Sequence, residues 1–540
     1  MFTDNVYHIK NAKACGKCDH VLQNSLELLD NLKKVRFFSS NEKKKSNFAR
    51  YKLIKHLMLT MKRLLCLVFV LAAALTVAAR GRQPVKKKTY VYRYYLTDKQ
   101  ATNFAIDMPQ RFLSERSIER RTRQHLPVDS TDLPVPRQYV QQFAVKGATV
   151  LGTSRWQNTV VVRSADTLLL NRLAQLPIVR EARCVYVAPD SIDKADDILW
   201  NVHDSFNRWD SVRNEPYGMA AQQIEMLNGL RLHEAGLTGK GMVIAILDGG
   251  FQNYDRIPAL QHAKVLGVWD FVNPGNPEDS NYPGSDFHRI DHGTRVFSAM
   301  AAYAPEVAIG TAPDASYWLL RSEDPATEQP VEEDYWTMAA EFADSVGADI
   351  INSSLGYHKY DDGLPSYRLR DLDGQTAFVS RTASMLARKG IVHCNSAGNS
   401  GIGEWKKIGV PADAPNILTV GAVDKKGVLA AFSSIGPSQD GRVKPDIVAL
   451  GHNTTLISGH GTLVHDMGTS FSTPVTCGMV ACLWQGLPHL TALQIIELVR
   501  QSADQYDAPN NIYGYGLPDF WKAYQQASPS LPKGRDVETQ

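Results

Sequence analysis

Short apolar runs alternate with helical patterns through the second half of the chain. The helical patterns, in which apolar residues recur at i, i+3 and i+4, cover 335–346, 376–389, 471–484 and 492–503. The apolar runs suit strands that are buried on both faces, and they cover 243–247, 317–320, 349–353, 391–395 and 417–421. This alternation predicts an α/β fold with a mostly parallel central sheet covered by helices, in a domain over 217–525.

A second pattern precedes this domain and predicts a small α+β domain over 85–190. Alternating and β-branched runs are typical of strands, and they occur at 90–96, 159–163 and 184–187. Helical patterns over 112–124 and 165–176 separate these runs. The polar stretch 191–216 is interpreted as a linker, and 526–540 as a polar C-terminal tail.

The first helix of the smaller domain is strongly basic, because it carries Arg116, Arg120, Arg121 and Arg123. The simplest interpretation is a helix face in contact with water. The alternative is that these side chains dock on a partner.

Residues 61–79 have the pattern of a secretory signal. Met61 is followed by Lys-Arg and by an apolar run from Leu64 to Ala79, which ends in small residues. This run is shorter than the roughly 20 residues that a membrane helix needs, so we expect cleavage after Ala79, export and no stable membrane span. Translation is then expected to start at Met61, which leaves 1–60 as an upstream extension outside the fold. The alternative is an uncleaved signal anchor.

Composition and charge exclude several classes of protein. Hydrophobic residues at 44% and charged residues at 21% are ordinary for globular domains, which excludes global disorder and a polytopic membrane protein. Residues 1–60 hold 12 basic and 5 acidic side chains, which leaves 47 basic against 51 acidic in the other 480 residues. A nucleic-acid binder usually has a basic excess in its folded part, so no nucleic-acid partner is expected.

Three polar motifs lie at strand ends or helix starts, where α/β proteins place their chemistry. Asp248 directly follows the apolar run 243–247. His292 opens an expected helix, and so does Ser470 in Gly-Thr-Ser-Phe-Ser-Thr-Pro474, where we expect the proline in the first helical turn. Taken singly, each motif is more often a cap or a turn than a catalytic group.

Together the three motifs supply a nucleophile, its base and the acid that orients the base. In their order, and in the motifs His292-Gly-Thr and Gly-Thr-Ser470, the chain resembles the subtilisin-like serine peptidases, or subtilases. The resemblance covers about 217–520. It implies that Asp248, His292 and Ser470 are the catalytic residues of a serine endopeptidase that works through an acyl-enzyme.

Two further segments resemble the same family. Asn399, in Ala-Gly-Asn-Ser-Gly, takes the place of the family's oxyanion-binding asparagine. The segment Ser354, Leu355 and Gly356 resembles the strand that lines the primary specificity pocket and pairs with substrate backbone. Peptides or proteins are therefore the expected substrates.

The resemblance also implies the architecture around the site. It implies a subtilisin-like three-layer sandwich, and it gives the domain over 85–190 the role of a ferredoxin-like βαββαβ propeptide that assists folding and inhibits the enzyme. The enzyme is then made as a zymogen and is secreted, periplasmic or held at the cell surface. Processing is expected within the linker, and the alternative is that the domain stays attached.

No cofactor and no metal site are assigned from the sequence. Cys15 and Cys18 lack a second ligand pair, and His460 and His465 lack a third ligand. Subtilases often carry structural calcium, which the resemblance makes an expectation, but no oxygen-ligand set is assigned to it here.

One residue departs from the family pattern, because Gly249 follows Asp248 where subtilases usually have Ser or Thr. This departure motivates the alternative function, a catalytically silent subtilase fold that binds peptides or serves as a surface module.

Six acids lie between 323 and 334, where the family has a substrate-flanking strand and loop. The simplest interpretation is a solvated acidic loop that caps the next helix. The alternative is a preference for basic residues upstream of the scissile bond.

Overall fold

The computed structural model of the chain describes residue 56 and residues 88–189, 216–279, 286–361 and 363–528. The expected signal 61–79, the extension before it except residue 56, nearly all of the linker 191–216 and most of the C-terminal tail lie outside these residues. Within the described part, no helix combines the length and the apolar character that crossing a bilayer requires.

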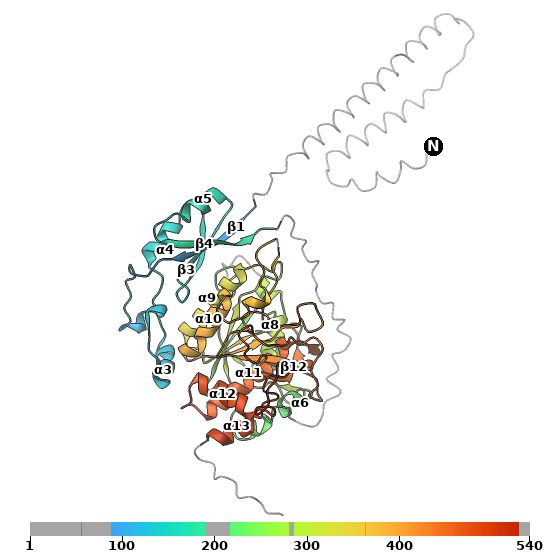
Figure 1. Cartoon of the computed structure of the whole chain (residues 1–540). Coiled ribbons are helices and arrows are strands. Elements are labelled where there is room, and N and C mark those ends of the chain that lie inside the picture. The colour runs from blue at the N-terminus through green and yellow to red at the C-terminus, as the bar shows by residue number, and fades with distance from the viewer. Residues whose placement is uncertain (1–55, 57–87, 190–215, 280–285, 362, 529–540) are drawn as a thin grey trace, which may run out of the picture. The chain divides into compact units, whose positions relative to one another are not determined.

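The N-terminal domain is built on a four-stranded antiparallel sheet in the order β2-β3-β1-β4. Its strands are β1 (Tyr90–Leu96), β2 (Thr149–Ser154), β3 (Thr159–Ser164) and β4 (Val179–Val187), and its helices are α3 (Glu115–Arg123), α4 (Arg137–Phe143) and α5 (Thr167–Leu173). The chain order is β1, α3, α4, β2, β3, α5, β4, which confirms the expected α+β class (Figure 1).

The two faces of this sheet have different partners, because side chains alternate between the faces of a strand. Tyr94 and Val160 face α4 and α5 in the domain's own small core. Val91 and Val161 point the other way and join a cluster with Trp336 of helix α9 (Val331–Val346), which belongs to the following domain. The second face of the sheet is therefore covered by that domain.

The larger domain is organised by a seven-stranded sheet in which every neighbouring pair is parallel. Its strand order is β13-β12-β11-β10-β5-β9-β6. The strands are β5 (Val243–Asp248), β6 (Lys264–Asp270), β9 (Ser316–Arg321), β10 (Ile350–Ser353), β11 (Val392–Ser396), β12 (Leu418–Val423) and β13 (Ile447–Leu450). This sheet confirms the predicted α/β class.

Helices cover both faces of the sheet, as the fully buried strand β5 requires. Ile244 and Ile246 pack with α8 (His292–Ala301) and α11 (Thr469–Gly486), whereas Ala245 and Leu247 pack with α9 and α10 (Phe378–Leu386). The central sheet and its helices can be followed in Figure 1. The remaining strands and α-helices of this domain are β7 (Tyr303–Ala304), β8 (Ala308–Ile309), β14 (His452–Ile457), β15 (Leu463–Met467), α6 (Ala221–Glu225), α7 (Leu230–Glu234), α12 (Ala492–Ser502) and α13 (Phe520–Ala527).

Two sequence-based predictions, that the basic helix face and the acidic stretch are exposed to solvent, are wrong in part. In α3, Arg120 and Arg121 are each only 1% exposed, so the docking alternative holds for these two side chains. In the acidic stretch, Glu332, Glu333 and Asp334 are buried within the first turn of α9. A run of charged side chains is exposed to solvent only where its helix lies at the surface of the protein. Here another part of the fold covers both helices.

Candidate active site

Asp248 and His292 form a directly hydrogen-bonded pair at the carboxyl edge of the sheet. Asp248 is the last residue of β5 and is fully buried, and His292 is the first residue of α8. The Nδ1 atom of His292 donates to the Asp248 carboxylate, at 2.8 Å from Oδ1 and 3.0 Å from Oδ2. Because the carboxylate can only accept, this contact places the proton on Nδ1 and leaves Nε2 free to act as a base.

The positive charge of a protonated His292 is favoured at this position. Burial of the ring opposes the charge, but the negative charge of Asp248 and its hydrogen bond outweigh burial and raise the pKa of His292 above its ordinary value. The side chain is still 37% exposed, so a substrate can reach its outer edge.

Ser470 lies in the first turn of α11, the helix that packs against α8. Its neighbour Phe471 contacts the His292 ring, with 5.7 Å between the ring centroids. The backbone N–H of Ser470 is one of the first four amides of the helix, which have no carbonyl partner within it. Ser470 therefore carries both the candidate nucleophile and a free amide donor, and the next residue along the chain contacts the imidazole ring.

The carbonyl of Ser470 lacks its usual hydrogen bond within the helix because of Pro474. In an α-helix this carbonyl would accept from the N–H of residue 474, but proline has none. It accepts instead from the Ser354 hydroxyl at 2.8 Å, and the Ser470 hydroxyl donates to the Ser354 carbonyl at 3.3 Å. Our expectation that Pro474 lies in the first turn is wrong, since it is the sixth residue of α11.

Asn399 follows β11 and is held in one orientation by Thr469. Its side-chain carbonyl oxygen accepts from the Thr469 backbone N–H at 2.9 Å and from the Thr469 hydroxyl at 3.0 Å. An amide whose oxygen is fixed in this way must point its NH₂ group elsewhere, and its nitrogen lies beside Gly468, near the start of α11. Asn399 can therefore offer a preoriented donor next to Ser470.

The segment after β10 is fixed from the neighbouring strand. The Leu355 carbonyl accepts from the Ser396 hydroxyl at 3.3 Å and from the Asn395 amide at 3.2 Å. Ser354 is tied to Ser470 as described, and Gly356 is exposed. The structure thus brings Ser354, Leu355 and Gly356 to the same edge of the sheet as the catalytic candidates.

Arg321 is a positioning residue that sequence reasoning missed. It ends β9 opposite Asp248 in the parallel register, and its Nε donates to the Gly249 carbonyl at 3.0 Å. The guanidinium is 1% exposed and is paired with the fully buried Asp270 at 3.0 Å. The Gly249 N–H in turn donates to Asp248 Oδ1 at 2.7 Å. Backbone contacts therefore fix Asp248 where the family's usual hydroxyl is missing.

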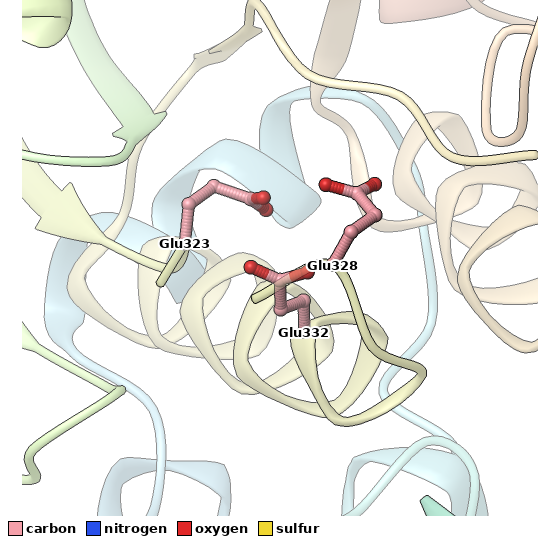
Figure 2. Close-up of side chains that lie close together, drawn as sticks. All are labelled: Glu323, Glu328 and Glu332. Atoms are coloured by element: carbon pink, nitrogen blue, oxygen red, sulfur yellow. The ribbon is translucent and has the colours of Figure 1, made fainter. Parts of the chain in front are cut away.

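Three carboxylates gather next to this edge, and Figure 2 shows how they face one another. Oxygens of Glu323, Glu328 and Glu332 lie within 4.8 Å of one another. Burial and then the neighbouring charge of Asp361 raise the pKa of Glu328 to about 7. The pKa values of Glu323 and Glu332 are also raised, by burial first and then by a neighbouring glutamate.

Carboxylates at this spacing could approach a divalent cation, but two of them already have protein partners. Glu323 is hydrogen-bonded to the Tyr357 hydroxyl, and Glu332 accepts from two backbone amides, those of Asp324 and Gln329. We assign no metal to the cluster. The preference for basic substrates stays a prediction, which matched peptides carrying Lys or Glu would test.

Two family models match the chain. The model of the subtilase family matches residues 239–516, about half of the chain, and the model of the peptidase S8 propeptide domain of Bacteroidota matches residues 91–197. The chain belongs to the subtilase family. It is a subtilisin-like serine protease, a hydrolase, preceded by a propeptide domain.

Curated relatives are similar over much of this length. An alkaline protease of Alkalihalobacillus alcalophilus is 26% identical over 352 residues, which are 65% of this chain and 80% of the relative. Subtilisin Savinase of Lederbergia lenta is 28% identical over 53% of this chain and 91% of its own length. Serine protease AprX of Bacillus subtilis is 28% identical over 52% of this chain and 65% of its own length.

Proposed function

We propose that this protease is an exported endopeptidase that hydrolyses peptide bonds through Asp248, His292 and Ser470. The observation that carries the proposal is the bond between the buried Asp248 and His292 Nδ1, with Ser470 at the start of the adjoining helix. The bond orients His292 as a base, and nucleophilic catalysis by serine needs such a base within reach of the hydroxyl.

The reaction begins when the Ser470 hydroxyl attacks the substrate carbonyl and His292 Nε2 accepts its proton. Asp248 stabilises the resulting imidazolium, and Asn399 with the Ser470 amide binds the oxyanion. His292 then returns the proton to the leaving amine, which yields an acyl-enzyme. Water, activated by the same imidazole, releases the acid product and restores the hydroxyl.

An extended peptide is the substrate that the site's edge favours. Residues 354–356 would pair with its main chain as an added strand, so that backbone hydrogen bonds give affinity and side-chain pockets give selectivity. Every chemical role in this scheme belongs to a group of the chain itself, so it takes no cofactor. A structural calcium ion remains an expectation from the family, and dialysis against a chelator, with melting temperature as the readout, tests it.

The signal pattern at 61–79 supports export, and the propeptide domain supports synthesis as a zymogen that the domain inhibits. N-terminal sequencing of the secreted protein tests both statements, because it reads the signal cleavage site and any later cut in one experiment.

The alternative of a silent, peptide-binding fold rests on Gly249 alone. Arg321 and the Gly249 amide provide other support for Asp248, which favours activity. The test is Ser470→Ala, with Ser502→Ala in α12 as the matched serine control. We expect the first to lower kcat by about six orders of magnitude, the loss known from subtilisin, and the second to leave it unchanged. A wild-type protein that cleaves no peptide would contradict the proposal.

A further inference from the structure

Arg295 lies one turn after His292 in helix α8 and binds two carboxylates at once. Its Nε atom donates to Asp291 Oδ2 at 2.9 Å, and its Nη2 atom lies 2.8 Å from the same oxygen. Its Nη1 atom donates to Asp466 Oδ2 at 2.7 Å. The arginine side chain is only 11% exposed, so water competes little with these charge-assisted hydrogen bonds. The guanidinium group therefore lies between the two carboxylates and holds them together.

Each of these carboxylates belongs to a segment that leads into a catalytic candidate. Asp291 directly precedes His292, and it also accepts from the Gly459 N–H, in the loop between β14 and β15, at 3.2 Å. Asp466 lies in β15, four positions before Ser470. Its Oδ1 atom accepts from the N–H of the next residue at 2.7 Å, so both oxygens of this carboxylate are held. The arginine thus joins the segment before the base to the segment before the nucleophile.

The chain between Asp466 and Ser470 has little freedom to absorb a displacement. Strand β15 ends one residue before Gly468, and helix α11 begins one residue after it. Gly468 itself donates its N–H to the Gly451 carbonyl at 2.8 Å. A shift of Asp466 relative to α8 would therefore move the first turn of α11, in which Ser470 lies.

We propose that Arg295 is a positioning residue that sets the approach of the Ser470 hydroxyl to the His292 imidazole. It acts on the nucleophile through Asp466 and on the base through Asp291, and it needs no contact with the substrate in this role. The inference rests on the proposed catalytic function and assigns that function a further residue.

The charge state of His292 gives a second way to detect this role. The charged or titratable groups around the ring are Asp248 of β5, Asp291 and Arg295 at the start of α8, Asp466 of β15, and Glu323 after β9, which acts on Asp248. Helix α11, described along its whole length, adds no charged side chain. Asp291 raises the pKa of His292, and Arg295 lowers it. Removing either charge should therefore shift this pKa, in opposite directions.

Steady-state kinetics on one peptide substrate compares Arg295→Met, Asp466→Asn and the double variant with the wild-type protein. We expect Asp466→Asn to lower kcat by about tenfold, the equivalent of roughly one net hydrogen bond, with little change in KM. Arg295→Met should lower kcat at least as much. The double variant should be no slower than Arg295→Met, because both changes remove the same bond. Arg295→Lys should restore only part of kcat, because an ammonium group lacks the planar fork that binds both carboxylates.

The pH profile of kcat/KM separates positioning from a general loss of stability. Arg295→Met should move the midpoint to higher pH, and Asp291→Asn should move it to lower pH. Asp466→Asn should move it less than either, because the guanidinium lies between this carboxylate and Asp291. The control is Arg256→Met, which removes a side chain that is 79% exposed and lies 3.7 Å from the exposed Asp255 carboxylate. It should leave kcat and the midpoint unchanged.

The variants are expected to fold, because the hairpin of β14 and β15 has a second contact with α8. The Ile457 N–H donates to the Ser298 hydroxyl at 2.9 Å, one turn beyond the substituted arginine. Melting temperatures of the variants check this expectation, and Asp466→Asn keeps the shape of the original side chain.

Losses of kcat that multiply in the double variant would overturn the proposal, and so would wild-type kcat in Asp466→Asn. Midpoints that move in the same direction in Arg295→Met and Asp291→Asn would overturn it as well. A wild-type protein that cleaves no peptide would overturn the proposed function together with this inference. An active wild-type protein whose variants act independently would overturn this inference alone.

Discussion

The Ser354 hydroxyl donates to the Ser470 carbonyl, and it can do so because Pro474 has no N–H to offer that carbonyl. The segment expected to bind substrate is thereby tied to the residue expected to attack it. A proline inside a helix usually costs stability, and here the missing helical bond is replaced by one that links two parts of the site.

Replacing Pro474 with Ala should therefore raise the stability of the protein and lower its activity. The new N–H can bond to the Ser470 carbonyl and compete with Ser354, so we expect a higher melting temperature and a kcat/KM lowered by about tenfold, the equivalent of roughly one net hydrogen bond. Ser354→Ala should lower kcat/KM as well, but without the gain in stability. Unchanged activity in both variants would show that this link does not position Ser470.

The pH dependence of the rate should report on His292. Because its pKa is raised, kcat/KM should rise with pH with a midpoint above the ordinary imidazole value of about 6.5. Asp248→Asn removes the charge that raises this pKa and leaves the burial that lowers it, so the midpoint should fall. The same variant should lose about 10⁴-fold in kcat, because an amide no longer fixes the tautomer. A rate that is flat from pH 5 to 8 would contradict the assigned base.

Gly249 and Gly250 give a matched pair of substitutions. A side chain at 249 would lie 3.7 Å from its nearest neighbours, on Glu323 and Ile290, whereas one at 250 would lie 2.8 Å from Ile290 and 2.9 Å from the Asp286 carbonyl. We expect Gly249→Ser to keep wild-type activity or exceed it, because it restores the family's hydroxyl without a clash. Gly250→Ser should reduce both folding yield and activity. Inactivity of Gly249→Ser despite normal folding would show that the glycine itself is required.

Asn399 and Thr469 should affect kcat in a graded way. Asn399→Ala removes an oxyanion donor, and we expect kcat to fall by about 10²- to 10³-fold with little change in KM. Thr469→Val removes one of the two bonds that orient the amide and keeps the other, so it should cause a smaller loss of the same kind. Steady-state kinetics on one peptide substrate distinguishes these results. A rise in KM alone would instead indicate a role in binding substrate.

Arg321→Ala tests the support of Asp248 from the neighbouring strand. The change removes the buried guanidinium that pairs with the Asp270 carboxylate and should destabilise the fold by about 3–5 kcal/mol. The double variant with Asp270→Asn should recover part of this stability. If Arg321 positions Asp248, kcat should stay low in the recovered protein, and the pH midpoint should shift. Full recovery of kcat would mean that Arg321 acts through stability alone.

Much of the fold could be predicted because the sequences of buried parallel strands are uninterrupted apolar runs. All five strands expected in the larger domain are present, within one or two residues of their predicted ends. Strands β6 and β13 were missed. Lys264–Asp270 mixes charged and apolar residues at a sheet edge. Ile447–Leu450 directly follows Lys-Pro-Asp, a sequence more typical of a turn than of the start of a strand.

The residues of the candidate site could be predicted only where a reactive side chain lies at the end of a recognisable apolar or helical segment. Asp248, His292 and Ser470 each end or begin a periodic segment, and the structure brings them to one edge. Arg321 also ends such a segment, but a lone arginine carries no motif. The burial of Arg120 and Arg121 could not be predicted either, because their partner Asp344 is more than 200 residues away.

The central claim is that Ser470 is a hydroxyl activated by His292, and covalent labelling tests it most directly. Wild-type protein and the variant His292→Ala would be treated with a fluorophosphonate, digested and mapped by mass spectrometry. The account predicts one phosphonyl group on Ser470 in the wild-type protein and none on that residue in the variant. Labelling of another residue, or equal labelling of Ser470 in both proteins, would contradict it.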